Sequence, residues 1–210
     1  MASTSRENIL NKIKQALAKP VPVPFPASEG NQNVFQPLQQ DLEIEFAENF
    51  SKLQGRFSFC TNEEELVNQL QTLVTLRKWT KLYSREPVLQ SKLSAAGFVA
   101  VYSDNVATCD AAITGCESLI ARTGSMVMSS AQLSGRTTSV YAPVHICIAY
   151  TNQLVYDIAA GLQQLREGYG QRFPSMVTLA TGPSRTADIE KTLVVGVHGP
   201  KEVFCFLVDG

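Results

Sequence analysis

Strand-like and helix-like segments alternate along this chain from residue 56 onward, and this alternation restricts the fold more than any other feature. The apolar runs RFSFC (56–60), KLYS (81–84) and FVAVYS (98–103) have the composition of strands. The segments between them place leucines at helical spacing, and Pro87 fits the first turn of the second helix. Strands joined by helices pair in parallel through crossover connections. The sequence therefore predicts an α/β fold with a mainly parallel sheet.

The alternation breaks in the middle of the chain. The runs AAITGCESLIA (111–121) and SMVMSS (125–130) are joined by three residues, which favours an antiparallel hairpin on or beside the parallel sheet. After them, VHICIAY (144–150) is a near-continuous apolar run, as expected of a strand buried on both faces. A helical pattern and two further strand-like runs, MVTLA (176–180) and EVFCFLVD (202–209), continue the predicted crossover units.

The N-terminal segment differs from the rest of the chain. A predicted amphipathic helix precedes PVPVPFP (20–26), whose prolines at alternate positions exclude a helix and favour an extended arm. The arm either tethers the helix to the domain or to a neighbouring subunit, or serves as a proline-recognition motif. We therefore divide the chain into an N-terminal helix with a proline-rich arm (1–36) and a single α/β domain (37–210).

Charge and cysteine content exclude several classes of protein. Eighteen basic and nineteen acidic residues leave a net charge of -1, so no global field attracts nucleic acid or an anionic membrane surface. The five cysteines form no CxxC or CxxxC pair, so they cannot provide the usual ligation of an iron–sulfur cluster or a zinc site. We expect no cofactor in this chain. The sequence has no apolar run of about 20 residues and no recognisable secretory signal, so we expect a cytoplasmic protein without a membrane span.

The segment TGPSRTADIE (181–190) is the strongest candidate for a ligand site. Ligands bind at the carboxyl ends of parallel strands, and this segment follows the predicted strand MVTLA. Arg185 offers a planar cation for a carboxylate or phosphate. The candidate binding residues are Gly182, Ser184, Arg185, Thr186 and Asp188. The alternative is structural, with Ser184 or Thr186 capping a helical turn and Arg185 paired with Asp188.

A second candidate is the stretch ARTGSMVMSSAQLSGR (121–136). Gly124 and Ser125 form a polar turn that a ligand can approach. Arg122 and Arg136 are candidate anion contacts. A plain hairpin with a polar connection explains the same residues without a ligand.

Histidines and carboxylates give further candidates. His198, among the glycines of GVHGP, is a candidate acid, base or carboxylate contact, whereas His145 is predicted to be a buried, hydrogen-bonded strand residue. Glu117 and Glu190 are the carboxylates nearest the candidate loops, and either can act as an acid, base or covalent acceptor, or only cap or solvate the surface. With two histidines and no third ligand, we predict no metal site.

The segments CDAAITGCESLIARTGSMVMSS, APVHICIAY and ATGPSRTADIEKTLVVGVHGP together resemble the lactate-utilization protein C family, whose members carry the LUD domain. The most specific element is GPSRTADIE followed closely by GVHGP. The resemblance implies a three-layer α/β/α fold similar to that of the sugar-phosphate isomerase and CoA-transferase superfamily. It also implies a part in the cytoplasmic oxidation of L-lactate to pyruvate, beside partner proteins that hold iron–sulfur clusters.

Three hypotheses follow for the function of the chain. The first is a component of the lactate-oxidising system that binds a small carboxylate or related anion through Arg185 and Arg136, with His198 nearby. The second is a non-catalytic scaffold that docks the iron–sulfur partner proteins through the N-terminal helix and arm. The third is a stand-alone transferase-like or isomerase-like enzyme for a CoA-linked or phosphorylated ligand, with Glu117 or Glu190 as the working carboxylate. We adopt the first hypothesis.

Overall fold

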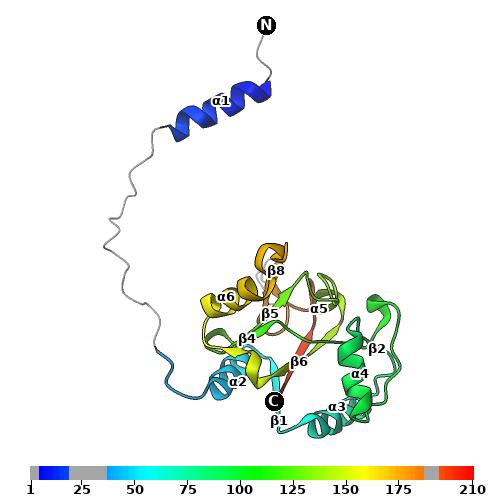
Figure 1. The fold of residues 1–210 in the computed structure, drawn as a ribbon. Helices are drawn as coiled ribbons and strands as arrows, with labels where there is room; N and C mark the ends of the chain where they lie inside the picture. Colours follow the sequence, from blue (N-terminus) through cyan, green and yellow to red (C-terminus); the bar gives the residue numbers. More distant parts are fainter. Residues whose placement is uncertain (1–4, 19–36, 187–193) are drawn as a thin grey trace. The chain divides into compact units, whose positions relative to one another are not determined.

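The computed structural model describes residues 5–18, 37–186 and 194–210. Contacts within the chain divide it into two units, Met1–Pro37 and Leu38–Gly210 (Figure 1). In the first unit, the described residues form α1 (Ser5–Leu17), where the sequence predicts a helix. The proline-rich arm lies outside the described residues. None of the helices that the structure describes is both long and apolar enough to cross a membrane.

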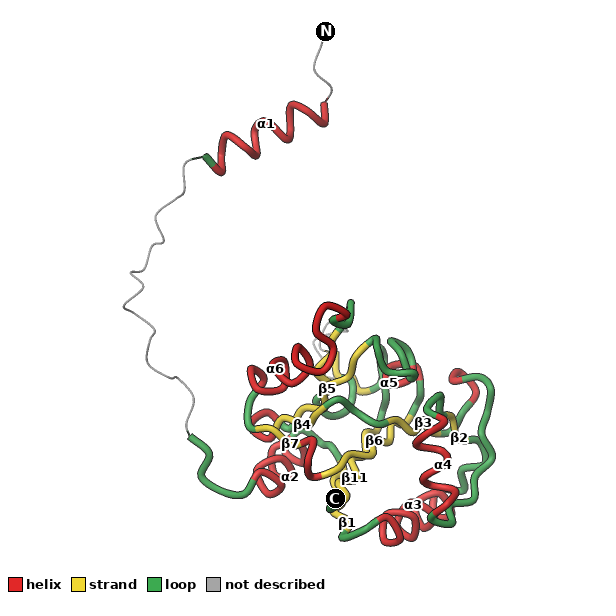
Figure 2. The backbone as a smooth tube through the Cα atoms, in the orientation of Figure 1, coloured by secondary structure: helices red, strands yellow, loops and turns green. Residues whose placement is uncertain are grey.

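A five-stranded parallel sheet forms the centre of the second unit (Figure 2). In spatial order its strands are β1 (Arg56–Cys60), β11 (Glu202–Val208), β6 (Val144–Tyr150), β3 (Ala111–Thr114) and β2 (Leu82–Tyr83). β6 and β11 are buried along almost their whole length, because each lies between two other strands and both faces of the sheet are covered. The predicted α/β class, the mainly parallel sheet and the buried strand at 144–150 are confirmed.

Two helices cover one face of the parallel sheet. α3 (Glu63–Arg77) begins where the Asn62 side chain accepts a hydrogen bond from the Glu65 N–H, at 2.9 Å. α4 (Pro87–Ala95) begins at the predicted proline, whose fixed φ suits the first turn of a helix. The buried leucines of both helices pack against apolar side chains of β3, β6 and β11 in one core.

The other face of the parallel sheet packs against α2 (Leu42–Lys52) and a second sheet. In spatial order, the second sheet consists of β7 (Leu154–Val155), β4 (Ser118–Ile120), β5 (Ser125–Ser129) and β8 (Val177–Ala180). β4 and β5 form the predicted antiparallel hairpin, which β7 and β8 extend on either side. Phe46 and Phe50 of α2 share a core with residues of both sheets, and α6 (Ile158–Tyr169) packs on the far face of the second sheet.

Two predictions about individual segments are wrong. β8 does not continue the parallel sheet but pairs antiparallel with β5 in the second sheet. FVAVYS (98–103) forms only a single bridge between Tyr102 and Leu82, and its Val99 and Val101 side chains are 79% and 70% exposed instead of packed on a neighbouring strand. The remaining short elements are η1 (Val106–Thr108), η2 (Ala121–Thr123), α5 (Thr138–Tyr141), η3 (Thr151–Gln153), η4 (Gly170–Arg172), β9 (Arg185–Thr186) and β10 (Val194–Val195).

Candidate functional site

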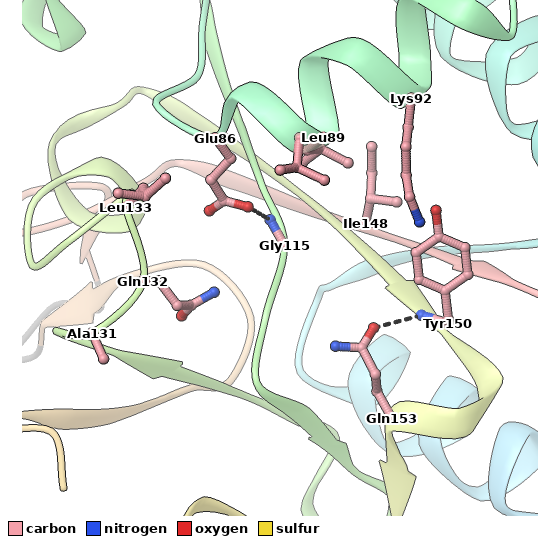
Figure 3. Close-up of a pocket in the computed structure, with 11 residues that line it drawn as sticks. Glu86, Leu89, Lys92, Gly115, Ala131, Gln132, Leu133, Ile148, Tyr150 and Gln153 are labelled. Carbon is pink, nitrogen blue, oxygen red and sulfur yellow. Dashed lines mark hydrogen bonds between the residues drawn. The ribbon is translucent and has the colours of Figure 1, made fainter. Parts of the chain in front are cut away.

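The carboxyl ends of three parallel strands border a cavity of about 450 Å³ (Figure 3). Glu86 follows β2, Gly115 follows β3 directly, and Tyr150 ends β6. This edge of an open α/β sheet is where ligands usually bind, because the connections leave the strands there. The other lining residues are Val88, Leu89, Lys92, Ala131, Gln132, Leu133, Ile148 and Gln153. We call this space the carboxyl-end cavity.

Glu86 supplies the carboxyl group of this cavity. It precedes Pro87 at the start of α4, and its Oε2 accepts a hydrogen bond from the Gly115 N–H at 2.9 Å. Its Oε1 accepts a hydrogen bond from the hydroxyl of Ser134, a buried residue. Burial raises the pKa of Glu86, the Gly115 N–H opposes this shift, and the negative charge of Glu117 adds to it. A carboxyl group with a raised pKa is better matched to proton exchange at neutral pH.

Glu117 lies beside this cavity, in a separate small cavity with a volume of about 90 Å³. Its Oε1 accepts hydrogen bonds from Ser129 Oγ at 2.5 Å and from the Tyr169 hydroxyl at 2.9 Å. Gln132 Oε1 accepts the N–H of Ser129 at 2.9 Å, so the end of β5 is tied to the wall of the carboxyl-end cavity. Glu117 therefore has the hydrogen-bonding partners that its sequence context did not reveal, and its charge acts on Glu86.

Lys92 carries the positive charge among the residues that line the carboxyl-end cavity. Its Nζ lies 4.8 Å from the centre of the Tyr150 ring, within the range of a cation–π contact. The Tyr150 hydroxyl donates to Glu63 Oε1 at 3.0 Å, and burial together with Glu63 raises the pKa of Tyr150 to about 12. The Gln153 side chain accepts the Tyr150 N–H at 2.8 Å and donates to the Cys116 carbonyl at 2.7 Å. Tyr150, whose ring lies beneath Lys92, is thus held at its hydroxyl by Glu63 and at its backbone by Gln153.

Several residues predicted to bind a ligand contact the end of α2 or neighbouring loop residues. Gly124 and Gly182 have φ values of +61° and +75°, and a Cβ atom on Gly182 would lie 2.5 Å from the Leu53 carbonyl oxygen. The Arg185 guanidinium donates to the same carbonyl oxygen. The buried Ser125 hydroxyl forms hydrogen bonds with Thr123 Oγ1 at 2.7 Å and Thr181 Oγ1 at 2.8 Å. The structure gives these residues contacts that hold loops onto the domain.

The remaining predicted residues lie in other places. Ser184 is brought to the loop that holds His198, since its N–H donates to the Pro200 carbonyl at 2.9 Å. Thr186 pairs with Val194 in the β9–β10 hairpin. Arg136 lines neither the cavity around Glu86 nor the one around His198, and its Nη2 donates to Ser175 Oγ at 2.6 Å. Asp188 and Glu190 lie outside the described residues. Ligand binding by this set stays a prediction.

His145 is a buried, hydrogen-bonded strand residue, as predicted. Its Nε2 lies 2.8 Å from Thr114 Oγ1, and burial lowers its pKa to about 4. Within the part of the chain that the structure describes, no three histidine, cysteine, aspartate or glutamate side chains form a group that could hold a metal ion.

The sequence patterns do not single out Glu86, Lys92 or Ser134: Glu86 and Lys92 match no known motif, and Ser134 is 48 residues from Glu86 in the chain. One signal was present for Glu86: it lies between the strand-like KLYS and a proline that starts a helix. Such a position is at the carboxyl end of a parallel strand, where ligand-binding residues are expected.

Comparison with known proteins gives a consistent set of relatives. The model of the LUD domain family matches residues 78–208. Lactate utilization protein C of Shouchella clausii is 35% identical over 101 residues, which cover 48% of this chain and 44% of that protein. Lactate utilization protein C 1 of Bacillus mycoides is 26% identical over 238 residues, covering 100% of this chain and 99% of the relative. In several alignments of higher identity, the match thus spans less than half of the relative's length.

A solved structure is similar in fold. The crystal structure of a DUF162 family protein from Deinococcus radiodurans superposes with a TM-score of 0.59 and 16% sequence identity, covering 80% of this chain and 96% of that chain. At this identity the likeness concerns the fold alone.

Proposed function

Because the chain belongs to the LUD domain family, we propose that it is a component of a cytoplasmic system that oxidises L-lactate to pyruvate. The proposal is supported by relatives named lactate utilization protein C, one of which aligns with the whole chain. We further propose that the carboxyl-end cavity binds a small carboxylate such as lactate or pyruvate, and that iron–sulfur partner proteins receive the electrons.

The observation that carries this proposal is the presence of Glu86 and Lys92 on one helix at the wall of one cavity (Figure 3). The Glu86 carboxyl lies at the Gly115 N–H and the Lys92 ammonium at the Tyr150 ring, so the wall of the cavity offers an acidic and a basic group at separate places. Lys92 pairs with the carboxylate of the ligand, while Leu89 and Ile148 supply an apolar wall for its methyl group.

Glu86 has the second role in the proposed site. In its ionised form it accepts a hydrogen bond from the 2-hydroxyl of lactate, and in its neutral form it donates one to the keto oxygen of pyruvate. Because the pKa of Glu86 is raised, the pH at which the two forms interconvert lies closer to neutral. The hydroxyl of Ser134 holds the carboxyl in place. The chain's own residues thus orient the ligand and hold the hydroxyl proton.

A scaffold function is the second candidate, and the rim of the same cavity favours it. Val88 and Leu133 line the cavity while their side chains are 70% and 63% exposed. These two side chains give the rim an apolar surface that a partner protein can cover. A scaffold would bind iron–sulfur partner proteins without affinity for lactate or pyruvate.

The experiment that tests the proposal is a thermal-shift and calorimetric titration of the full chain with L-lactate and pyruvate. Both ligands should bind saturably, and at 100 times its Kd a ligand should add about 2.7 kcal/mol to the free energy of unfolding. Lys92→Ala should weaken binding about tenfold, or about 1.4 kcal/mol. Arg172→Ala, which removes an exposed cation that does not line the carboxyl-end cavity, is the matched control and should bind like the wild type. No saturable binding, or equal binding by Lys92→Ala, would overturn the assignment.

A further inference from the structure

A second cavity, of about 480 Å³, lies at the opposite end of the parallel sheet. It is bordered by the end of α5, by Pro143 just before β6, and by residues 196–201 just before β11. Both strands begin at this edge, and we call this space the amino-end cavity. It shares no lining residue with the carboxyl-end cavity. It includes His198, which sequence patterns single out, together with Lys201 and Tyr141.

The loop that forms one wall of the amino-end cavity is fixed by close backbone contacts. Gly196 has a φ of +80°, and a Cβ atom there would lie 2.2 Å from Lys201 Cγ, so only glycine lets the lysine stem lie against the loop. The Lys201 N–H donates to the Pro143 carbonyl at 2.8 Å, and the Gly196 N–H donates to the Ser184 carbonyl at 2.9 Å. These contacts fix the backbone that carries His198 and the lysine.

The described lining of this cavity includes basic side chains but no acidic ones. Among the described residues, neither His198 nor Lys201 makes an ion pair or a side-chain hydrogen bond. The acidic residue next to the lysine, Glu202, is already paired with Arg56 at 3.0 Å and with Arg77 at 2.6 Å. Among the described lining residues, the Lys201 ammonium therefore gives the cavity a local positive potential, and the His198 imidazole adds a polar ring that can bind an anion.

The lining of the amino-end cavity also offers a surface for a ring. Tyr141, at the end of α5, lines the amino-end cavity and is 67% exposed, and Val197 in the loop that lines the same cavity is 43% exposed. An exposed aromatic face beside an aliphatic side chain can stack a planar group. A volume of this size lies within the usual range of small-molecule sites.

We propose that the amino-end cavity binds a phosphorylated small molecule with a planar ring, of the nucleoside monophosphate class. Lys201 and His198 contact the phosphate, which carries enough charge for two basic partners, and Tyr141 stacks on the ring. The site is separate from the proposed lactate site, so either ligand can bind without the other.

The test is a calorimetric titration of the full chain with adenosine monophosphate, adenosine and inorganic phosphate. Adenosine monophosphate should bind at least about tenfold more tightly than either fragment, because it alone makes both contacts. Lys201→Ala should weaken adenosine monophosphate and phosphate about tenfold and leave adenosine unchanged. Tyr141→Ala should weaken the nucleotide and adenosine but leave phosphate unchanged.

Control variants separate this site from the other cavity. Lys92→Ala and Arg172→Ala should both bind adenosine monophosphate with wild-type affinity, and thermal melts should establish that every variant is folded. The proposal is overturned if the wild type shows no saturable binding of the nucleotide, if Lys201→Ala binds it as the wild type does, or if binding is lost in Lys92→Ala. Equal affinity for the nucleotide and for phosphate would overturn the ring contact.

Discussion

The two ends of the parallel sheet have cavities of similar volume and different charge. The carboxyl-end cavity combines a carboxyl group, Glu86, with one ammonium group, Lys92, among mostly apolar side chains. The amino-end cavity has His198 and Lys201 and no acidic side chain in its described lining. These charged groups lie on helices and connections and not within the strands, so one sheet can offer two chemically distinct sites.

Replacing Gly124, which lines neither cavity, should cause the largest loss of stability. Its φ is +61°, and a Cβ atom there would lie 2.4 Å from the Phe50 backbone nitrogen, so Gly124→Ala should cost about 3 kcal/mol or more of the free energy of unfolding. Gly135→Ala is the matched control, because Gly135 has a φ of +63° with nothing near its Cβ position, and should cost about 1 to 2 kcal/mol. Urea unfolding measures both, and equal losses would refute the packing argument.

The sheet between the two ends should be sensitive to acid through His145. Burial lowers the pKa of His145 from 6.5 to about 4, so the unfolded chain binds a proton in this range that the folded chain does not. The wild type should therefore lose on the order of 3 kcal/mol of stability as the pH falls through this range. His145→Gln, whose amide can still pair with Thr114, should lack most of this loss in urea unfolding at about pH 7 and pH 4. The same pH dependence in both proteins would contradict the assignment.

Replacing Arg185 tests whether this residue binds a ligand, as the sequence predicts, or only holds the Leu53 carbonyl. Because its guanidinium donates to the Leu53 carbonyl, Arg185→Ala should cost about 1 kcal/mol of stability. It should change the affinity of either cavity by less than about twofold, since it lines neither. If Arg185 binds the carboxylate instead, lactate affinity should fall about tenfold while adenosine monophosphate binding is unchanged. Titrations of both ligands decide between these outcomes, with Arg185→Lys as the charge-conserving control.

The smallest expected effect is a difference in the pH dependence of stability between two carboxyl groups, one at each end of the sheet. Because the pKa of Glu86 is raised in the folded protein, its stabilising contribution is present in acid and is lost as the pH rises. Glu86→Gln should therefore gain stability relative to the wild type from about pH 4 to pH 7. Asp110, just before β3, is the opposite case, because the N–H groups of Lys81 and Thr80 lower its pKa. Asp110→Asn should lose relative stability as the pH rises. Parallel trends in the two variants would refute the contrast.

Sequence patterns predict the features of this fold that depend on neighbouring residues. The apolar run at 144–150 indicates a buried strand, and Pro87 marks the start of α4, because burial and backbone stereochemistry act locally. The pairing of β8 with β5 was missed, since an apolar strand of four residues does not encode its partner. The carboxyl-end cavity was missed for the same reason: Glu86, Gly115 and Ser134 meet only after the strands have paired.

The position of β11 has a consequence for how a cell produces this domain. β11 lies between β1 and β6, yet it follows every other strand in chain order. During synthesis, β1 and the group of β6, β3 and β2 therefore cannot join into one sheet until residues 202–208 have emerged from the ribosome. Until then, the edges of β1 and β6 that pair with β11 stay unpaired. Completion of the sheet is then a late event in vectorial synthesis, and a nascent chain stalled before Glu202 is a substrate for chaperones or for aggregation.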